Sequence, residues 1–519
     1  MDLEQSFAST CKVLFGEEIG KLSDFEGYLG EMMTGYSRKK SFVSGKDVLI
    51  SLPYYPESAR YISQDEMGEL KFPPLNVNEI KDIDSLFSAV QERVAYCGNK
   101  LFGRNIEVSD VDNCIDCTHV SHAHNVREVK YGAYLSYLRE SEYVFGVWGF
   151  PGSRMSIRVA EGTGSTRCFE SYYSSDISDL YYSINCIGCT DGIFAFNLRS
   201  KRNVIGNLEL PKDEYSELKK KLLSEISDEL RKKKRLFSLA DIAFFGRDRG
   251  KISEEILYDS PVPPKIESAF GSASKLVLGK ERKDIRKYSQ WLLKRAMKIW
   301  KVRGARGTPT FKLSEIPVVR ELPADRLLPL DEAIDSGKTG IEMKKGEKPG
   351  LAELLSRASK IAYFTVEFED GQNENCVDTP ALFGGSNIYK SWDTTDGKNS
   401  AYTTAIVRSS YLFGGFLRLL DSTFCINCFN ITKVSNSFEI DSSYSTRNSY
   451  LCHNVENADS CILCFNVKGL RNAVGNTSVS REEFERVKKL LLDYINKELD
   501  EKRGTELSIF SIPKPGKKG

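Results

Sequence analysis

The sequence lacks most of the features that assign a chain to a functional class. No apolar run in its 519 residues approaches the ~18 residues of a membrane-spanning helix. Lys and Arg (73) nearly balance Asp and Glu (72), which excludes a uniformly basic nucleic-acid binder and an acidic solvating tail. The sequence contains no P-loop, GxSxG, HExxH or GxGxxG motif. Its first residues, Met1-Asp2-Leu3-Glu4-Gln5, are acidic and polar, so we expect no signal peptide.

Histidine is rare, with four residues, and the 13 cysteines are an odd number. An odd count without a secretion signal predicts free thiols or metal ligands in a reducing compartment rather than a disulfide framework. We therefore expect a cytoplasmic protein, or part of a virion assembled in the cytoplasm. Hydrophobic residues make up 40% of the chain, which is enough for several cores in roughly two to four domains.

What the sequence does contain is an internal repeat. Residues 169–230 align without a gap to residues 438–499, and 20 of the 62 positions are identical. The shared stretch includes Asn203-Val204-Ile205-Gly206-Asn207, which matches Asn472-Ala473-Val474-Gly475-Asn476. We predict a tandem duplication of a unit of about 120–150 residues.

A shorter period of 12 residues runs inside each unit. At every twelfth position an apolar column appears, formed by Ile426, Phe438, Tyr450, Ile462 and Val474, with Phe169, Tyr181, Ile193 and Ile205 as its counterpart. Columns of small residues and of Asn or Ser run beside it. Such columns are typical of short strands stacked about 4.8 Å apart, with apolar columns facing inward and Asn, Asp, Ser and Gly in the turns. An antiparallel meander of short hairpins is the alternative.

The predicted fold is mainly β with helical caps: a tandem duplication of a narrow parallel β-solenoid with about 12 residues per turn, each copy followed by a capping α-helix. Apolar positions three or four apart predict the cap helices, and Ser480-Arg481-Glu482-Glu483 is a capping box at the start of the second. We predict an α+β region at 1–105, a first solenoid at 106–207, its cap at 208–235, a partly helical linker at 236–350, a second solenoid at 351–476, its cap at 477–503 and a basic tail at 504–519.

Positive charge is concentrated in residues 280–306, which hold eleven Lys and Arg against Glu281 and Asp284. Apolar residues at helical spacing predict one basic amphipathic helix here. Such a helix suits the phosphate backbone of RNA or DNA, an acidic protein or an anionic membrane surface. The alternative is a packed helix with a solvated basic face. The candidate binding residues are Lys283, Arg286, Lys287, Lys294, Arg295, Lys298, Lys301, Arg303 and Arg306.

Four Cys-x-x-Cys pairs invite comparison with zinc sites. The pairs 186/189, 425/428 and 461/464 face small or apolar residues in the other unit, so we interpret them as core residues. The pair 114/117 differs, because three of the four histidines follow it within a few residues. A zinc site formed by Cys114, Cys117, His119 and His122 is one prediction, and a polar loop at the start of the solenoid is the alternative.

Evidence for catalysis is sparse. Some parallel β-helices are polysaccharide lyases or hydrolases with Asp clusters on one face, and Asp176, Asp179 and Asp191 fall in the first predicted solenoid. Their counterparts in the second unit are Ser or Asn, and turn positions favour Asp for conformational reasons. We therefore predict no enzymatic activity, and we assign no catalytic residue.

The run Cys461–Asn472 resembles a motif of an uncharacterised Cys-rich repeat family from candidate-phylum bacteria and tailed-phage metagenomes, whose members are sometimes mislabelled CaiB/BaiF. The shared elements are the Gly-Leu-Arg-Asn signature at 469–472 and a helix start of the Lys-Glu-Glu-Tyr type at 212–215 and 481–484. The zinc ribbon that often begins family members has no counterpart before Cys97. The resemblance implies the repeat architecture and no established function.

These observations favour a non-enzymatic structural or interaction protein, in which two solenoids form a scaffold within a large assembly such as a virion. Its expected partners are other protein subunits. A nucleic-acid or ribonucleoprotein-associated factor that docks through 280–306 is the second hypothesis, with RNA or DNA as the partner. A carbohydrate-active β-helix enzyme is the third.

Overall fold

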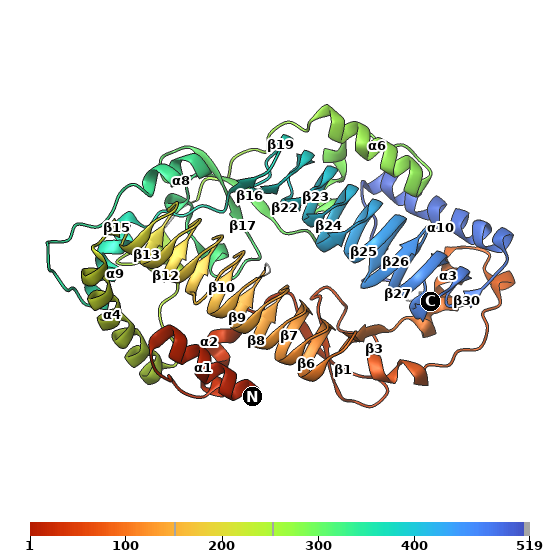
Figure 1. Cartoon of the computed structure of the whole chain (residues 1–519). Coiled ribbons are helices and arrows are strands. Elements are labelled where there is room, and N and C mark those ends of the chain that lie inside the picture. Colours follow the sequence, from red (N-terminus) through yellow and green to blue (C-terminus); the bar gives the residue numbers. More distant parts are fainter. Residues whose placement is uncertain (150–151, 252–253, 513–519) are drawn as a thin grey trace.

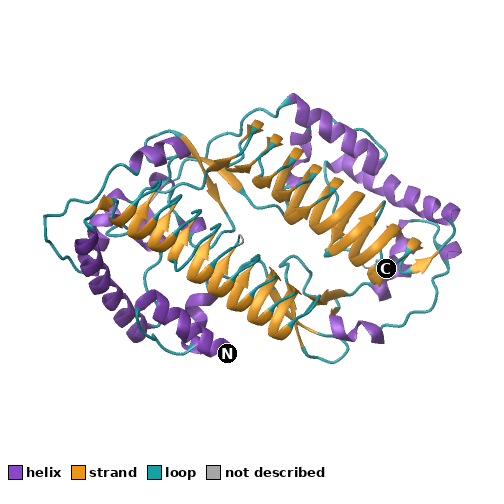
Figure 2. Cartoon of the chain, in the orientation of Figure 1, coloured by secondary structure: helices purple, strands orange, loops and turns teal. Residues whose placement is uncertain are grey.

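The computed structural model describes residues 1–149, 152–251 and 254–512. Two large sheets run side by side through the molecule (Figure 1). Most of the helices lie along the outer flanks of the two sheets (Figure 2). The chain is therefore mainly β, as predicted, with parallel strands in both sheets. None of the helices in the described ranges combines the length and apolar character that a bilayer crossing requires.

The first sheet has 11 strands, which follow one another in chain order. They are β5 (Leu101–Phe102), β6 (Ile106–Ile115), β7 (Thr118–Arg127), β8 (Lys130–Ser136), β9 (Glu142–Trp148), β10 (Arg154–Ala160), β11 (Phe169–Tyr172), β12 (Ser178–Ile184), β13 (Thr190–Phe196), β14 (Arg202–Ile205) and β15 (Leu208–Glu209).

The second sheet has 13 strands in the described ranges, and two of them, β25 and β27, each pair with two later strands. They are β18 (Phe368–Asp370), β19 (Glu374–Val377), β20 (Ala381–Phe383), β21 (Ser386–Tyr389), β22 (Trp392–Thr395), β23 (Lys398–Val407), β24 (Ser410–Leu420), β25 (Thr423–Asp441), β26 (Ser443–Arg447), β27 (Tyr450–Ile462), β28 (Phe465–Lys468), β29 (Arg471–Val474) and β30 (Thr477–Ser478).

The remaining elements precede or follow the sheets. The helices are α1 (Leu3–Phe15), α2 (Glu26–Gly30), α3 (Ile83–Val90), α4 (Lys212–Lys233), α5 (Leu239–Ala243), α6 (Pro264–Leu278), α7 (Ser289–Leu292), α8 (Leu330–Ser336), α9 (Leu351–Ile361) and α10 (Arg481–Lys502). The short strands are β1 (Ser37–Lys40), β2 (Asp47–Ile50), β3 (Tyr61–Ser63), β4 (Tyr96–Gly98), β16 (Ile299–Arg303) and β17 (Pro309–Leu313).

The register of both sheets follows the predicted period. Phe169 pairs with Tyr181 and Ile193 pairs with Ile205, and each partner lies 12 positions further along the chain. In the second sheet a one-residue insertion in β24 shifts the step to 13, as between Leu412 and Cys425, before the step of 12 resumes. The pairings are parallel except at β15 and β30, which turn back on β14 and β29.

Left-handed backbone recurs at every third residue. From Glu107 to Tyr143 each third residue has a φ between 47° and 62°, and the same spacing continues through both sheets. This conformation costs most residues about 1–2 kcal/mol but is easier for Gly, Asn and Asp. The preference explains the Asn columns, in which Asn185 Nδ2 donates to Asn197 Oδ1 at 3.0 Å and Asn436 Nδ2 donates to Asn448 Oδ1 at 2.8 Å.

The packing corrects one part of the sequence prediction. The apolar columns do not belong to the buried clusters that lie within each sheet alone. They form one core with the helices, as when the Phe15 ring packs edge-on against Phe169 and Tyr181 OH donates to the Leu14 carbonyl. Each sheet has a separate buried cluster of smaller side chains, chiefly Val, Leu, Ile, Ala and Cys, which we call its narrow interior. The strands thus bury side chains on both faces, which is why the columns beside the apolar one are also apolar or small.

The cysteines are core residues. All 13 are free thiols, and all but Cys376 are buried. The pairs 186/189, 425/428 and 461/464 lie in the two narrow interiors, as predicted. Burial, together with a hydrogen bond to Cys189, raises the pKa of the Cys186 thiol, so it is held in the neutral form that such a core favours.

The two predicted cap helices are present as α4 and α10, and Ser480 forms the predicted capping box. Each packs beside a helix from the other half of the chain: α4 beside α9 and α10 beside α3. The end of each sheet is also hydrogen-bonded to a residue from the other half of the chain, an arrangement that we call crossed closure. The Ile341 N–H donates to the Gly206 carbonyl at 2.8 Å, and Arg93 Nη1 donates to the Gly475 carbonyl at 2.9 Å.

The structure differs from the predicted elements in three places. Residues 280–306 do not form one helix: a 3₁₀ turn at Ile285–Tyr288 and α7 lead into β16, which pairs with β17. The second sheet begins at Phe368, because Leu351–Ile361 is helix α9. The first part of the predicted tail is ordered, with Leu507, Ile509 and Phe510 buried in the core, and residues 513–519 lie outside the described ranges.

Candidate functional site

The predicted basic surface at 280–306 is largely neutralised within the chain. Five of its nine candidate residues form ion pairs with carboxylates, as in Lys301–Asp378 at 3.1 Å and Arg303–Glu255 at 2.6 Å. The others are Lys287, Lys294 and Arg306. The apolar positions of the segment pack inward, with Trp291 stacked on Phe438. The segment therefore holds the second sheet rather than presenting a free phosphate-binding face.

Of the four remaining candidates, Arg286 donates to the Ser260 carbonyl at 2.8 Å and Arg295 lies over the ring of Phe510 at 4.7 Å. Within the described part of the chain only Lys283 and Lys298 lack a recorded side-chain partner. Two isolated lysines do not make a nucleic-acid interface, for which several phosphate contacts are typical.

The predicted zinc ligands do not converge. The Cys114 and Cys117 thiols lie in the narrow interior of the first sheet and are fully buried. His119 points outward and contacts Glu107 through Nδ1 at 2.8 Å, and His122 contacts Asp110 through Nε2 at 3.3 Å. Among the described residues no group of three or more His, Cys, Asp and Glu side chains could hold a metal ion. The sequence spacing failed because His119 and His122 occupy left-handed positions, where their side chains pair with Glu107 and Asp110 instead of joining the core that holds Cys114 and Cys117.

The aspartates considered for catalysis are also apart from any reactive cluster. Asp176, Asp179 and Asp191 all occupy left-handed positions, as expected of turn residues. Asp179 Oδ2 accepts from Arg167 at 2.6 Å, and Asp191 pairs with Lys219 at 2.9 Å. The first pair joins neighbouring repeats of the first sheet, and the second joins the sheet to helix α4.

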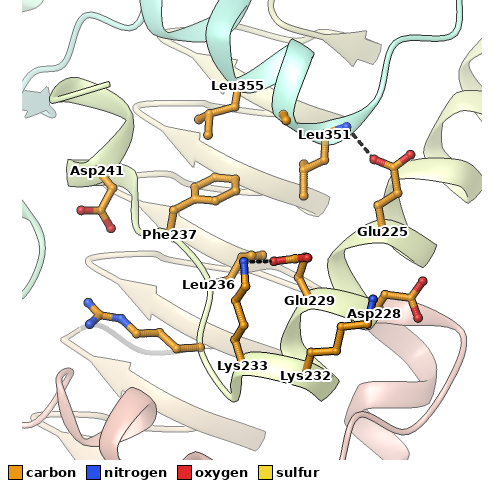
Figure 3. Close-up of a pocket in the computed structure, with 12 residues that line it drawn as sticks. Glu225, Asp228, Glu229, Lys232, Lys233, Leu236, Phe237, Asp241, Leu351 and Leu355 are labelled. Carbon is orange, nitrogen blue, oxygen red and sulfur yellow. Dashed lines mark hydrogen bonds and ion pairs between the residues drawn. The ribbon is translucent and has the colours of Figure 1, made fainter. Parts of the chain in front are cut away.

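An open groove of about 820 Å³ lies between the end of α4, the following segment and α9 (Figure 3). Its floor is apolar, and the Phe237 ring stacks on Tyr182 with centroids 4.5 Å apart. Lys233 pairs with Glu229, and a Glu225 oxygen accepts the Leu351 N–H at 2.6 Å, which fixes the start of α9. These charged groups therefore serve the local structure.

A buried polar network, missed by sequence reasoning, joins the N-terminal region to the second sheet. Tyr55 OH donates to the Asp441 carboxylate, which also accepts from His453 Nδ1 at 2.6 Å. His453 Nε2 accepts the Cys97 N–H at 2.9 Å, so the ring is neutral with its proton on Nδ1. Burial lowers the pKa of His453, against the opposing effect of Asp441. The one sequence signal was that Asp441 and His453 interrupt a column otherwise formed by Phe429 and Phe465.

A second buried pair lies close by. Lys100 Nζ contacts Asp112 at 2.9 Å, and Asp112 also accepts from the Ser51 N–H at 2.7 Å. Both charged side chains are fully buried. Because no solvent reaches these groups, their geometry matches structural ion pairs between segments rather than groups that exchange protons with a substrate.

Glu367 is a further titratable group, half-buried, whose hydrogen-bond partners also come from other segments. Thr310 Oγ1 donates to its Oε1 at 2.8 Å, and the Leu330 N–H donates to its Oε2 at 3.0 Å. Burial raises its pKa to about 7 from an ordinary value of 4.5. The folded protein therefore retains a proton that the unfolded chain releases above pH 4.5, and stability declines as the pH rises towards 7.

We expect Glu367→Gln, which cannot ionise, to remove this decline. Its free energy of unfolding relative to the native chain should improve by about 3 kcal/mol between pH ~4.5 and ~8, since each pKa unit corresponds to about 1.4 kcal/mol. Urea titrations at both pH values measure the difference. Glu374→Gln, at an exposed position on the nearby strand β19, is the matched control. Parallel pH profiles for the two variants would contradict the assignment.

A cavity of about 320 Å³ lies between the two sheets, and we call it the inter-sheet cleft. One wall comes from β5, β6, β7 and Arg139, which follows β8, and the other comes from β24–β27. The walls meet where Asn430 Nδ2 donates to Asn125 Oδ1 at 2.9 Å. Two arginines, Arg127 and Arg139, line the first wall. Charged and polar side chains from both sheets line the inter-sheet cleft.

Comparison of the chain with protein-family models, with curated proteins and with solved structures finds no match.

Proposed function

We propose that the protein is a non-enzymatic structural or interaction protein, a rigid double β-solenoid that serves as a scaffold in a larger assembly. The observation that carries the proposal is the register of 12, which both sheets follow except at the one-residue insertion in β24. Solenoids of this kind present long, repetitive faces that suit assembly with other subunits.

The backbone supports the solenoid part of the proposal. A left-handed residue at every third position would turn the chain four times in 12 residues, giving a narrow four-sided turn. β25 spans 19 residues, which is more than one such turn, and pairs with β24 before it and with β26 and β27 after it. A meander would give antiparallel pairs, whereas these are parallel.

The element order supports duplication of the whole chain. α1 and α6 each precede a short turn, a short helix and a hairpin, followed by a large sheet and a 22-residue helix. When the α1 and α6 regions are aligned without a gap, five positions are identical. Glu4, Phe7, Ser9, Lys12 and Gly16 match Glu267, Phe270, Ser272, Lys275 and Gly279. In this interpretation, 280–306 is the counterpart of the segment that holds the first sheet, which explains why its charges are paired.

The buried ionisable groups favour a scaffold over an enzyme. His453, Glu367 and Glu439 have displaced pKa values because of burial, and each has hydrogen-bond partners from a distant segment. Their partners hold distant segments together, and none of the three residues lines the groove between α4 and α9 or the inter-sheet cleft. The nucleic-acid hypothesis loses support, because most of the basic side chains in 280–306 are paired within the chain.

Light scattering across a size-exclusion peak, with absorbance at 260 and 280 nm, tests the proposal. We expect particles several times the 58.5 kDa mass of one chain when the protein is purified from its native source. A monomer under those conditions would refute the assembly role. A high 260/280 ratio that persists after charge reversal at Lys283 and Lys298 would show nucleic acid bound elsewhere.

A further inference from the structure

The inter-sheet cleft brings two like charges together on one wall. Arg127 and Arg139 lie on consecutive turns and form a parallel bridge, so their side chains start about 4.8 Å apart. Arg127 Nη2 contacts Glu128, its exposed neighbour, at 2.9 Å. Among the described residues Arg139 has no carboxylate within ion-pair distance. Two guanidinium groups side by side repel each other unless an anion lies between them.

The surroundings of Arg139 increase this need for an anion. Burial lowers its pKa, and the charges of Arg127 and Arg408 lower it further, while Asp393 and Glu140 act in the opposite direction. Arg408 is occupied by Asp421, which contacts its Nε at 2.8 Å. The guanidinium of Arg139 is thus partly desolvated and faces a cavity rather than a protein carboxylate.

The opposite wall offers neutral hydrogen-bonding groups. Ser442, Tyr444 and Asn454 line it, together with the Val455 side chain. Its one carboxylate, Glu456, is paired with Lys468 at 2.6 Å. A positive wall that faces hydroxyl and amide groups suits an anion attached to a polar organic group, and the volume fits a small molecule.

The corresponding junction elsewhere in the molecule is filled. At the 269-residue offset of the repeat, Asn430 and Ser442 correspond to Glu161 and Tyr173. There the hollow between the sheets is only about 20 Å³, because Tyr173, Phe383 and Trp392 occupy it. Packing two such sheets therefore does not by itself leave a cavity, and the inter-sheet cleft is a specific feature of one junction.

We infer that the inter-sheet cleft binds a small phosphorylated molecule, with Arg127 and Arg139 as its phosphate ligands and the Ser442–Asn454 wall as the site of its polar organic part. Guanidinium groups bind phosphate oxygens in pairs, and two of them match the charge of a phosphomonoester. This inference does not depend on the assembly role.

Isothermal titration of the full chain tests it with inorganic phosphate, glucose 6-phosphate, AMP, glucose and adenosine. We expect saturable binding of at least one phosphorylated probe and none of glucose or adenosine. Tighter binding of an ester than of phosphate identifies an organic phosphate as the ligand, and equal binding identifies free phosphate. Arg127→Gln and Arg139→Gln should each weaken binding about tenfold or more, because each removes charge-assisted hydrogen bonds.

Arg202→Gln is the matched control, since Arg202 is an exposed arginine on β14 of the same sheet. It should bind like the native chain. Melting curves without ligand show whether the Arg127 and Arg139 variants are folded. Because each substitution removes one of two repelling charges, the melting temperature should be unchanged or higher. The inference is overturned if no phosphorylated probe binds at millimolar concentration, or if the folded double variant binds as tightly as the native chain.

Discussion

Replacing Arg158 with methionine is expected to lower the free energy of unfolding by about 3–5 kcal/mol. The Arg158 side chain is fully buried under α2. Its Nε donates to the Glu170 carboxylate, and its Nη1 contacts Glu31 at 3.0 Å. Glu170 is also fully buried, so the substitution leaves a carboxylate in the core with only tyrosine hydroxyls as donors. Urea unfolding followed by tryptophan fluorescence measures the loss.

A second substitution separates this charge effect from a loss of packing. The double variant Arg158→Met/Glu170→Gln should recover about 2 kcal/mol, because glutamine carries no charge and its carbonyl still accepts from Tyr172. Arg154→Met, at an exposed position of the same strand β10, should change stability by less than about 0.5 kcal/mol. If the double variant were as unstable as Arg158→Met alone, the buried pair would not be the cause.

Gly98→Ala is expected to destabilise the fold by about 3 kcal/mol through a backbone clash. A Cβ on Gly98 would lie 2.2 Å from the Leu49 carbonyl oxygen and 2.6 Å from Val48 Cγ1. β2 and β4 would have to separate, and this movement would pull the Cys97 N–H away from His453. The buried Cys97 thiol should therefore react faster with an aromatic disulfide reagent in the variant.

Gly68→Ala provides the control, because nothing lies within 4 Å of the added carbon there. It should match the native chain in both urea midpoint and thiol reactivity. An unchanged midpoint for Gly98→Ala would show that β2 and β4 can separate at little cost, and that the network around His453 does not depend on their spacing.

The repeat could be predicted from the sequence because its contacts are local. Residues that pair, such as Phe438 and Tyr450, are only 12 positions apart, so the same environment recurs at a fixed step. The cap helices were predicted for a similar reason, since one face of each is apolar. The direction of the columns was not predicted, because the strands bury both faces and alternation cannot tell a narrow interior from a helix-covered surface.

The basic segment shows where local pattern failed. Ile285, Leu292 and Ile299 fit one face of a helix. However, Ile299-Trp300-Lys301-Val302 is rich in β-branched and aromatic residues and pairs with Pro309–Leu313 after a Gly-containing turn. The charges gave no indication of their partners, because Asp378 lies 77 positions from Lys301.

The buried network and the inter-sheet cleft were beyond sequence reasoning for the same reason. Tyr55 meets Asp441 across 386 positions, and Asn125 meets Asn430 across 305. Nothing in a single sequence marks such pairs, whereas the 12-residue step marks its own repeats.

The crossed closure of the two sheets has a consequence during synthesis. The end of the second sheet meets Arg93, which is made long before it, so that sheet can be closed as soon as it forms. The end of the first sheet must wait for Ile341, roughly 130 residues later, a delay on the order of 10 seconds at typical translation rates. During that interval the nascent chain exposes an unpaired strand edge to its neighbours on the same polysome. Fast translation or a holding chaperone would therefore matter more for the first half of this chain than for the second.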